Sequence, residues 1–169
     1  MRVLFAFAIP VLLISAPARA EPPKLAVFDF ELLDTSLEGE MLGPQADEHN
    51  RLIRISDQVR RQLLESGKFQ ILDIAPVKAA AEASNLQSCG GCDVEFAQRI
   101  GADLVITGVM RKISTLILNL TIFVRDAHTG KLINAMNADF RGNTDESWTR
   151  ATSYLVRNRL LEPNFGRRQ

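Results

Sequence analysis

The feature that most constrains the fold is a strand, a helix and a second strand in succession near the amino terminus. Residues 24–33 begin apolar on both faces and then alternate, as a central strand does, and residues 68–73 form a shorter strand pattern. Between them, apolar side chains repeat at helical spacing and the repeat ends in glycine, at Leu52, Ile55, Val59, Leu63 and Gly67. Because such connections are right-handed crossovers, the pattern predicts two parallel strands with a helix packed on them.

The rest of the chain predicts two short helices, a three-stranded meander and a closing helix. We expect helices at residues 75–85, 92–101 and 143–161, and strands at residues 102–114, 115–126 and 131–142. Gly130 can take the positive φ of a hairpin turn, and Asn143 or Thr144 can cap the last helix. The order β-α-β-α-α-β-β-β-α predicts a single α/β domain over residues 21–162, with a mixed five-stranded sheet and helices packed on it. Residues 163–169 are expected to form a flexible tail.

The first 20 residues have the pattern of an export signal. Arg2 gives a positive start, an apolar run interrupted by Pro10 follows, and residues 18–20 (ARA) fit the small-x-small cleavage pattern. The apolar run is too short for a membrane anchor, which takes about 20 residues. No cysteine follows the cleavage point to carry a lipid. The pattern predicts cleavage after Ala20, a periplasmic location and no membrane anchor.

Charge and motifs argue against several classes of function. The chain has 20 basic and 20 acidic residues, and without Arg2 and Arg19 of the leader the balance is mildly acidic, which disfavours nucleic-acid binding. The sequence contains no P-loop, no dinucleotide-binding glycine pattern, no G-x-S-x-G elbow and no histidine metal motif. We therefore expect no cofactor and no enzymatic activity.

Cys89 and Cys92 are the only cysteines in the chain and allow three interpretations. A Cys-x-x-Cys pair at a helix start can be a redox centre, because the helix amino terminus favours the thiolate. A zinc site is disfavoured, since it needs four ligands and the only histidines, His49 and His128, lack ligand spacing. An oxidising compartment and two intervening glycines favour the third interpretation, a structural disulfide.

An acidic segment follows the first predicted strand. Its carboxylates are Asp34, Glu38, Glu40, Asp47 and Glu48. Carboxylates are ligands for calcium, but the spacing matches no EF-hand. We expect a mobile, partner-facing loop here, because long connections in compact domains are often functional.

The remaining polar candidates are weaker. Asp29 lies in the first predicted strand without a matching base or nucleophile, so we expect it to be hydrogen-bonded at the end of the sheet. We expect Arg111 and Lys112 on a solvated face and His128 in a hairpin turn.

Several motifs resemble an α/β domain shared by the curli-secretion channel subunit CsgG and the amino-terminal domain of TolB. The matching stretches are LAVFDF, LLESGKFQILD, AQRIGADLVITGVM and VRDAHTGKLI, and the resemblance covers nearly all of residues 24–161. It is strongest to small, secreted, functionally uncharacterised bacterial members of this superfamily. The motif glycines Gly101, Gly108 and Gly130 have structural reasons, so the resemblance transfers no catalytic residue. Without a lipidation cysteine or pore-building segments, it does not imply a channel.

This resemblance implies a non-catalytic periplasmic binding or accessory protein with a periplasmic or envelope protein partner. The partner system it suggests is an envelope assembly or a periplasmic quinoprotein alcohol-oxidation system. The alternative function is that of a thiol–disulfide oxidoreductase using Cys89 and Cys92.

Overall fold

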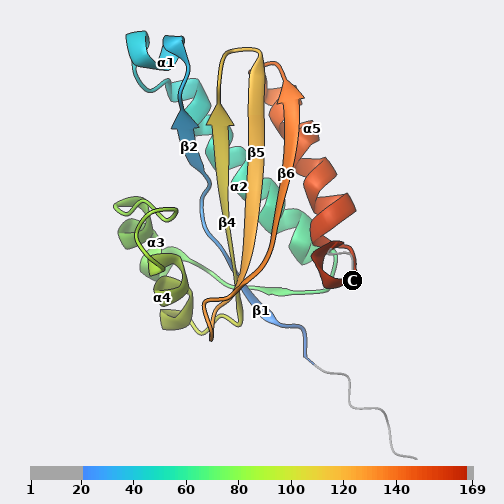
Figure 1. Cartoon of the computed structure of the whole chain (residues 1–169). Helices are drawn as coiled ribbons and strands as arrows, with labels where there is room; N and C mark the ends of the chain where they lie inside the picture. The colour runs from blue at the N-terminus through green and yellow to red at the C-terminus, as the bar shows by residue number, and fades with distance from the viewer. Residues whose placement is uncertain (1–20, 167–169) are drawn as a thin grey trace, which may run out of the picture.

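The computed structural model describes residues 21–166 (Figure 1). The expected export signal at residues 1–20 and the last three residues of the expected tail lie outside this range. The strands are β1 (Lys24–Val27), β2 (Glu31–Asp34), β3 (Gln70–Ile71), β4 (Leu104–Lys112), β5 (Ile117–Asp126) and β6 (Leu132–Arg141). The helices are α1 (Leu37–Leu42), α2 (Ala46–Glu65), α3 (Ala75–Glu82), α4 (Cys92–Arg99) and α5 (Asp145–Leu155), which continues into the π-helical turn η1 (Val156–Leu160) and the 3-10 turn η2 (Pro163–Gly166).

The strands form one mixed sheet, which confirms the predicted α/β class but not the predicted number of strands. The sheet has six strands instead of five, in the order β3-β1-β4-β5-β6, with β2 also paired to β4. β1 is parallel to β3, as the crossover rule predicts. β1 and β2 are also parallel to β4. β4, β5 and β6 form an antiparallel meander. The sixth strand arises because the first predicted strand is interrupted, and its two halves pair with successive parts of β4.

Side chains of α2 cause the interruption between β1 and β2. The backbone N–H of Phe30 donates to the Ser56 hydroxyl at 2.9 Å, and the Arg60 guanidinium donates to the carbonyl of Val27 at 2.9 and 3.0 Å. These contacts replace strand hydrogen bonds, so the chain bends without leaving its polar groups unpaired. Gly108 on β4 accommodates the bend, since a Cβ there would lie 2.6 Å from the Phe30 ring.

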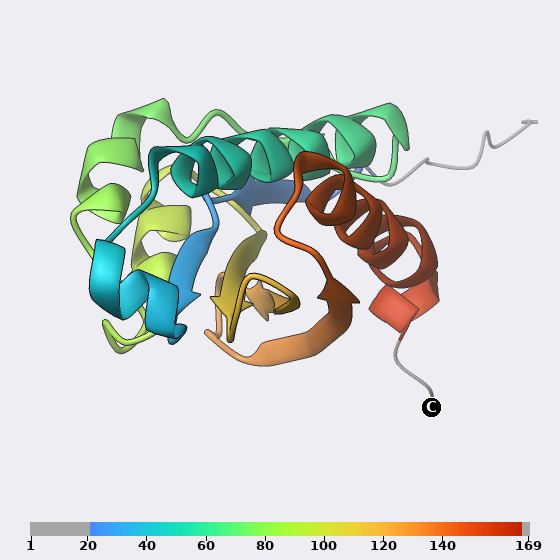
Figure 2. The same cartoon turned by 90° about the horizontal axis from the view of Figure 1, so that it is seen from above.

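Helices cover both faces of the sheet around β1. α2 and α5 contact each other and lie together over one face, whereas α3 and α4 lie on the opposite side of β1 (Figure 2). Alternation along β1 divides the core accordingly. Leu25 and Val27 belong to the cluster that includes α2 and α5, and Ala26 and Phe28 to the cluster that includes α3 and α4. The apolar first half of this strand therefore lies between two helical layers.

Several local predictions are confirmed. The four apolar positions predicted for α2 are buried, Gly67 follows the helix with positive φ, and Gly130 has positive φ in the hairpin turn. Thr144 caps α5 in a capping box with Ser147. Leu116, within the predicted middle strand, precedes β5 and is 52% exposed.

Part of the expected tail contacts the domain. η2 brings the Phe165 ring to 6.0 Å from the Phe69 ring, and the Phe165 carbonyl accepts a hydrogen bond from Asn134 of β6. Between residues 21 and 166, no helix has the length and apolar character needed to cross a bilayer.

Candidate functional site

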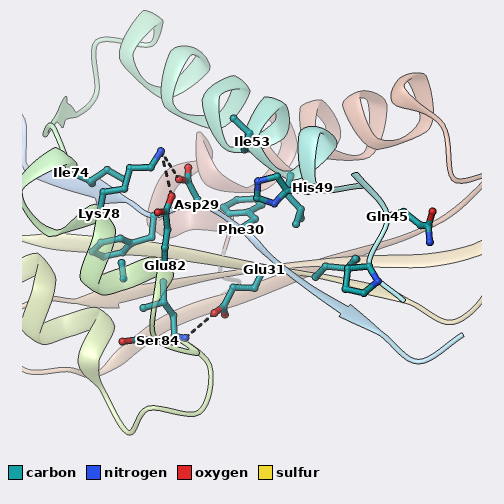
Figure 3. A pocket seen from close by; sticks show the side chains of 16 residues that line it. Asp29, Phe30, Glu31, Gln45, His49, Ile53, Ile74, Lys78, Glu82 and Ser84 are labelled. Carbon is teal, nitrogen blue, oxygen red and sulfur yellow. Dashed lines mark hydrogen bonds and ion pairs between the residues drawn. The ribbon is translucent and has the colours of Figure 1, made fainter. Parts of the chain in front are cut away.

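A cleft of about 520 Å³ lies at the carboxyl end of β1, between α2 and α3 (Figure 3). The chain leaves β1 toward α2 on one face of the sheet and leaves β3 toward α3 on the other. In open α/β sheets, such a reversal leaves a crevice beyond the strand ends, where ligands commonly bind. The walls are largely apolar, with Leu52 and Ile53 from α2 and Ile74 at the start of α3. A few charged side chains interrupt them, as in most small-molecule sites.

Asp29 carries the best-defined charge in the cleft. Its carboxylate lies 2.6 Å from Arg60 of α2 and 3.1 Å from Lys78 of α3, and Lys78 also lies 3.6 Å from Glu82. Burial opposes ionisation of Asp29, but the hydrogen bonds and charges of Arg60 and Lys78 outweigh it and lower its pKa. The same pairing raises the pKa of Lys78. Asp29 is thus hydrogen-bonded at the sheet end, as predicted, and its ionised form is favoured.

Glu31 lines the cleft from β2. One carboxylate oxygen accepts the backbone N–H of Leu86 at 2.8 Å and fastens the segment after α3 to the sheet. The other oxygen is buried and has no hydrogen-bond partner among residues 21–166. Figure 3 shows the carboxylate directed at the segment after α3. Its geometry indicates a structural role.

The serine that lines the cleft makes a local backbone contact. Ser84 donates its hydroxyl to the carbonyl of Ala80. His49 lines the cleft from α2, whereas Ser84 lines it from the segment after α3. A hydroxyl nucleophile requires a base within hydrogen-bond reach, and across the described residues no such contact joins Ser84 to a base.

The acidic segment surrounds a buried lysine, which the sequence analysis did not predict. Lys112, expected on a solvated face, is fully buried at the end of β4. Three carboxylates surround its ammonium nitrogen, from Asp34 at 3.2 Å, Glu38 at 2.6 Å and Glu48 at 2.6 Å. Burial alone would lower the lysine pKa, but the hydrogen bonds that the ammonium donates to the three carboxylates raise it. The ammonium therefore lies where these carboxylates would hold a cation.

Within the described residues, no group of three histidine, cysteine or acidic side chains has metal-binding geometry. Asn143 also contacts Glu48, donating to its carboxylate at 2.6 Å, and accepts from the Trp148 indole at 3.0 Å. A polar chain thus links the buried lysine to the start of α5.

Much of the expected loop is helical. α1 occupies six of its residues, and α2 begins at Ala46, before the apolar repeat that starts at Leu52. Ser36 caps α1 by accepting the N–H of Gly39, and a Cβ on Gly39 would lie 2.3 Å from the Asp34 carboxylate. Three of the five predicted carboxylates thus converge on Lys112, whereas Glu40 and Asp47 are exposed.

α1 exposes large apolar side chains, which the acidic character of this segment did not indicate. None of its residues is buried, and Leu37, Met41 and Leu42 are 70%, 73% and 66% exposed. We call these three residues the α1 surface. Ile113, Leu116 and Ile117 at the β4–β5 turn are also exposed, at the same end of the sheet (Figure 1). Large apolar side chains grouped in this way are typical of interaction sites.

Cys89 and Cys92 form a disulfide between α3 and α4, with their Cα atoms 5.7 Å apart. Gly90 and Gly91 take φ values of 73° and 111°, which L side chains rarely adopt, so they allow the tight loop. Cys92 is the first residue of α4, and Cys89 lies in the exposed loop. The structure does not bring the pair to the cleft or to Lys112. His128 occupies the predicted hairpin turn and lies 3.2 Å from Asp103.

This mixed α/β fold is similar to that of several solved structures. Among solved structures, lipoprotein GNA1162 from Neisseria meningitidis matches with 18% identity and a TM-score of 0.50, over 72% of this chain and 83% of that one. The LpoB carboxyl-terminal domain from Salmonella enterica matches with 16% identity and a TM-score of 0.49, over 75% of this chain and 87% of that one. TolB from Acinetobacter baumannii matches with 13% identity and a TM-score of 0.43, over 82% of this chain and 28% of TolB. At these identities, the likeness concerns the fold alone.

Residues 23–160 match the DUF3280 family model, described as "Protein of unknown function (DUF2380)". The chain belongs to this family. No curated protein matches the sequence.

Proposed function

We propose that this protein is a non-catalytic, exported accessory protein that binds a periplasmic or envelope protein partner through the α1 surface. The observation that carries the proposal is the exposure of Leu37, Met41 and Leu42 on a helix with no buried residue. Leaving three large apolar side chains in water is unfavourable by roughly 1.5–3 kcal/mol each relative to full burial, so covering them favours association. The export pattern and the fold shared with a lipoprotein support a partner in the bacterial envelope.

The proposal keeps a role for the acidic segment expected to face a partner. Glu40 on α1 and Asp47 in the first turn of α2 are exposed, whereas the buried Lys112 holds the other three carboxylates. Exposed carboxylates at the rim of an apolar patch favour partners with basic groups around an apolar centre. We further propose that the partner belongs to an envelope assembly or to a quinoprotein alcohol-oxidation system. The sequence resemblance to CsgG-like and TolB-like domains suggests these two systems.

The test compares the mature protein with a triple variant, Leu37→Ser, Met41→Ser and Leu42→Ser. The matched control is Leu64→Ser, because Leu64 is 61% exposed on α2, outside the α1 surface. Partners are captured from periplasmic extract, purified and titrated against each variant. A purified quinoprotein alcohol dehydrogenase from the same cells is titrated directly. We expect the triple variant to lose at least about tenfold in affinity, equivalent to 1.4 kcal/mol, while the control binds like the wild type. Equal binding by all three proteins would refute the role of the α1 surface.

The alternative function, thiol–disulfide exchange, is supported by the position of Cys92 at the first residue of α4, where a helix favours a thiolate. It predicts reduction of a disulfide substrate such as insulin by the reduced protein. A reduced protein that alkylates as an ordinary thiol of pKa near 8.5 and shows no turnover would exclude this function.

A further inference from the structure

A second unassigned surface lies at the other edge of the sheet, where β6 meets α5 (Figure 1). β6 is the last strand in the sheet order, and no strand within residues 21–166 pairs with its outer side. A groove of about 980 Å³ runs along this edge. On the strand side, it is lined by five consecutive residues, from Asn137 to Arg141. Consecutive residues of a strand point to opposite faces, so this groove follows the backbone edge of the strand.

The other wall of the groove is one face of α5. Ser147, Arg150, Ala151 and Tyr154 recur at intervals of three and four residues, which places them on one side of the helix. Tyr154 is 52% exposed and offers an aromatic surface. The amino-terminal part of β6 is covered by η2, because the Asn134 side chain there donates to the Phe165 carbonyl. The open edge is thus limited to residues 137–141, roughly 14 Å of strand at ~3.4 Å per residue.

We propose that this groove binds an extended segment of another protein, which adds to β6 as a further strand beneath α5. An unpaired strand edge supplies main-chain donors and acceptors, and the flanking side chains supply selectivity. This site is independent of the α1 surface, which lies at the opposite edge of the sheet (Figure 1).

The groove chemistry specifies the segment. Ala138 and Phe140 are half-buried against the core under α2 and α5, so side chains of an added strand that point to the same face meet Ala151 and Tyr154 and should be apolar. Asn137, Asp139 and Arg141 are exposed on the opposite face. Asp139 accepts a hydrogen bond from Asn119, whereas Arg141 makes no ion pair inside the described chain. An alternating apolar and polar segment with an acidic residue beside Arg141 fits these groups.

A second copy of the chain fits this groove poorly. Antiparallel pairing of two β6 edges in one sheet requires a twofold axis perpendicular to the sheet, which places both α5 helices over the same face of the junction. Paired strands lie about 4.8 Å apart, but packed helices need 8–10 Å between their axes. Since α5 already forms one wall of the groove, the space suits a chain with no helix of its own at that edge.

The experiment uses the mature chain with a probe strand joined to its carboxyl end by about eight Gly/Ser residues. The linker spans roughly 16 Å, enough to reach the groove from η2, and raises the effective concentration of the probe to about the millimolar range. The probe is Glu-Val-Thr-Val-Thr-Val. Its matched control, Glu-Val-Pro-Val-Pro-Val, lacks two of the backbone donors that a ladder needs. Amide hydrogen exchange of residues 137–141 is measured in both fusions and in the unfused protein.

We expect exchange at alternate amides of residues 137–141 to slow at least about tenfold with the valine–threonine probe, because an added strand protects only the outward N–H groups. The proline probe should leave these amides unchanged. Absent protection, or equal protection by both probes, overturns the proposal. Protection in the unfused protein that rises with concentration, together with a dimer mass, would also overturn it by showing a second copy at this edge.

Discussion

The ammonium nitrogen of Lys112 lies 2.6 Å from a carboxylate oxygen of Glu48, and the two side chains are 0% and 2% exposed. Lys112 ends β4 and Glu48 lies in the first turn of α2, so the pair joins the sheet to the helix layer at one point. Two charges this deeply buried are each tolerated only because the other is present. Glu38 contacts the same nitrogen, which ties α1 to this pair.

Replacing Lys112 by methionine should destabilise the protein strongly. The substitution keeps the volume and apolar stem but leaves Glu48 buried without its cation, which typically costs about 3–5 kcal/mol. Arg111→Met is the control, since Arg111 is the exposed neighbour on the same strand. Urea unfolding measures the difference in unfolding free energy. In the Lys112→Met background, Glu48→Gln should recover part of the loss. If Lys112→Met matched Arg111→Met in stability, the buried pair would have no structural importance.

Asp29 should make the stability depend on pH in the acid range. Its pKa is lowered in the folded state, so its ion pairs stabilise the fold above the unfolded-state pKa of about 3.9 and are lost as pH falls through the folded-state value. Asp29→Asn should therefore reduce stability near neutral pH by about 1.5 kcal/mol, the usual value of a charged hydrogen bond. The deficit should shrink as pH falls below about 4.

The control for this pH series is Asp57→Asn. Asp57 also pairs with Arg60, at 2.8 Å, but its side chain is 58% exposed, and exposed pairs contribute little. Denaturant unfolding is repeated across the acid range for all three proteins. A constant deficit of Asp29→Asn at every pH would show that the ionisation of Asp29 does not contribute.

The elements that sequence predicted best depend on local patterns. β5 repeats apolar residues at every second position, and Leu118, Leu120, Ile122 and Val124 are all fully buried. The interruption between β1 and β2 could not be seen in the same way, because alternation continues through Phe28 and Phe30. Its cause lies in Ser56 and Arg60, which reach the strand from the helix that follows. Contacts between segments distant in sequence leave no periodic signal.

The site around Lys112 was missed although one signal was present. Lys112 follows Ile106, Gly108 and Met110 at the two-residue spacing of one strand face, and all four are buried. A lysine that continues the spacing of a buried strand face requires a buried counter-charge. The acidic segment after the first predicted strand is rich in carboxylates that could supply it. Sequence alone could not place Glu48 on that lysine, since α2 begins at Ala46, six residues before the first position of its apolar repeat, Leu52.

Gly108→Ala should destabilise the protein by steric overlap. A Cβ at this position would lie 2.6 Å from the Phe30 ring, closer than carbon atoms approach in folded proteins. Forcing an extra methyl into a packed core typically costs about 1–3 kcal/mol. Thermal unfolding of Gly108→Ala, Phe30→Leu and the double variant forms a cycle. We expect the double variant to be more stable than the sum of the two single losses predicts, because the smaller side chain relieves the overlap. Strict additivity would contradict the close approach.

Cys89 and Cys92 should be oxidised to each other in the exported protein, with a structural role for the bond. The loop closed by the disulfide is short, so the chain-entropy estimate for its stabilisation is about 2 kcal/mol at most. Replacing both cysteines by serine should therefore lower Tm by no more than about 8 °C, with the fold and partner binding unchanged. Intact mass spectrometry with and without reductant measures the oxidation state, and a binding assay follows with the double variant. Free thiols in the native protein, or a folded double variant that no longer binds its partner, would assign the pair a role beyond structure.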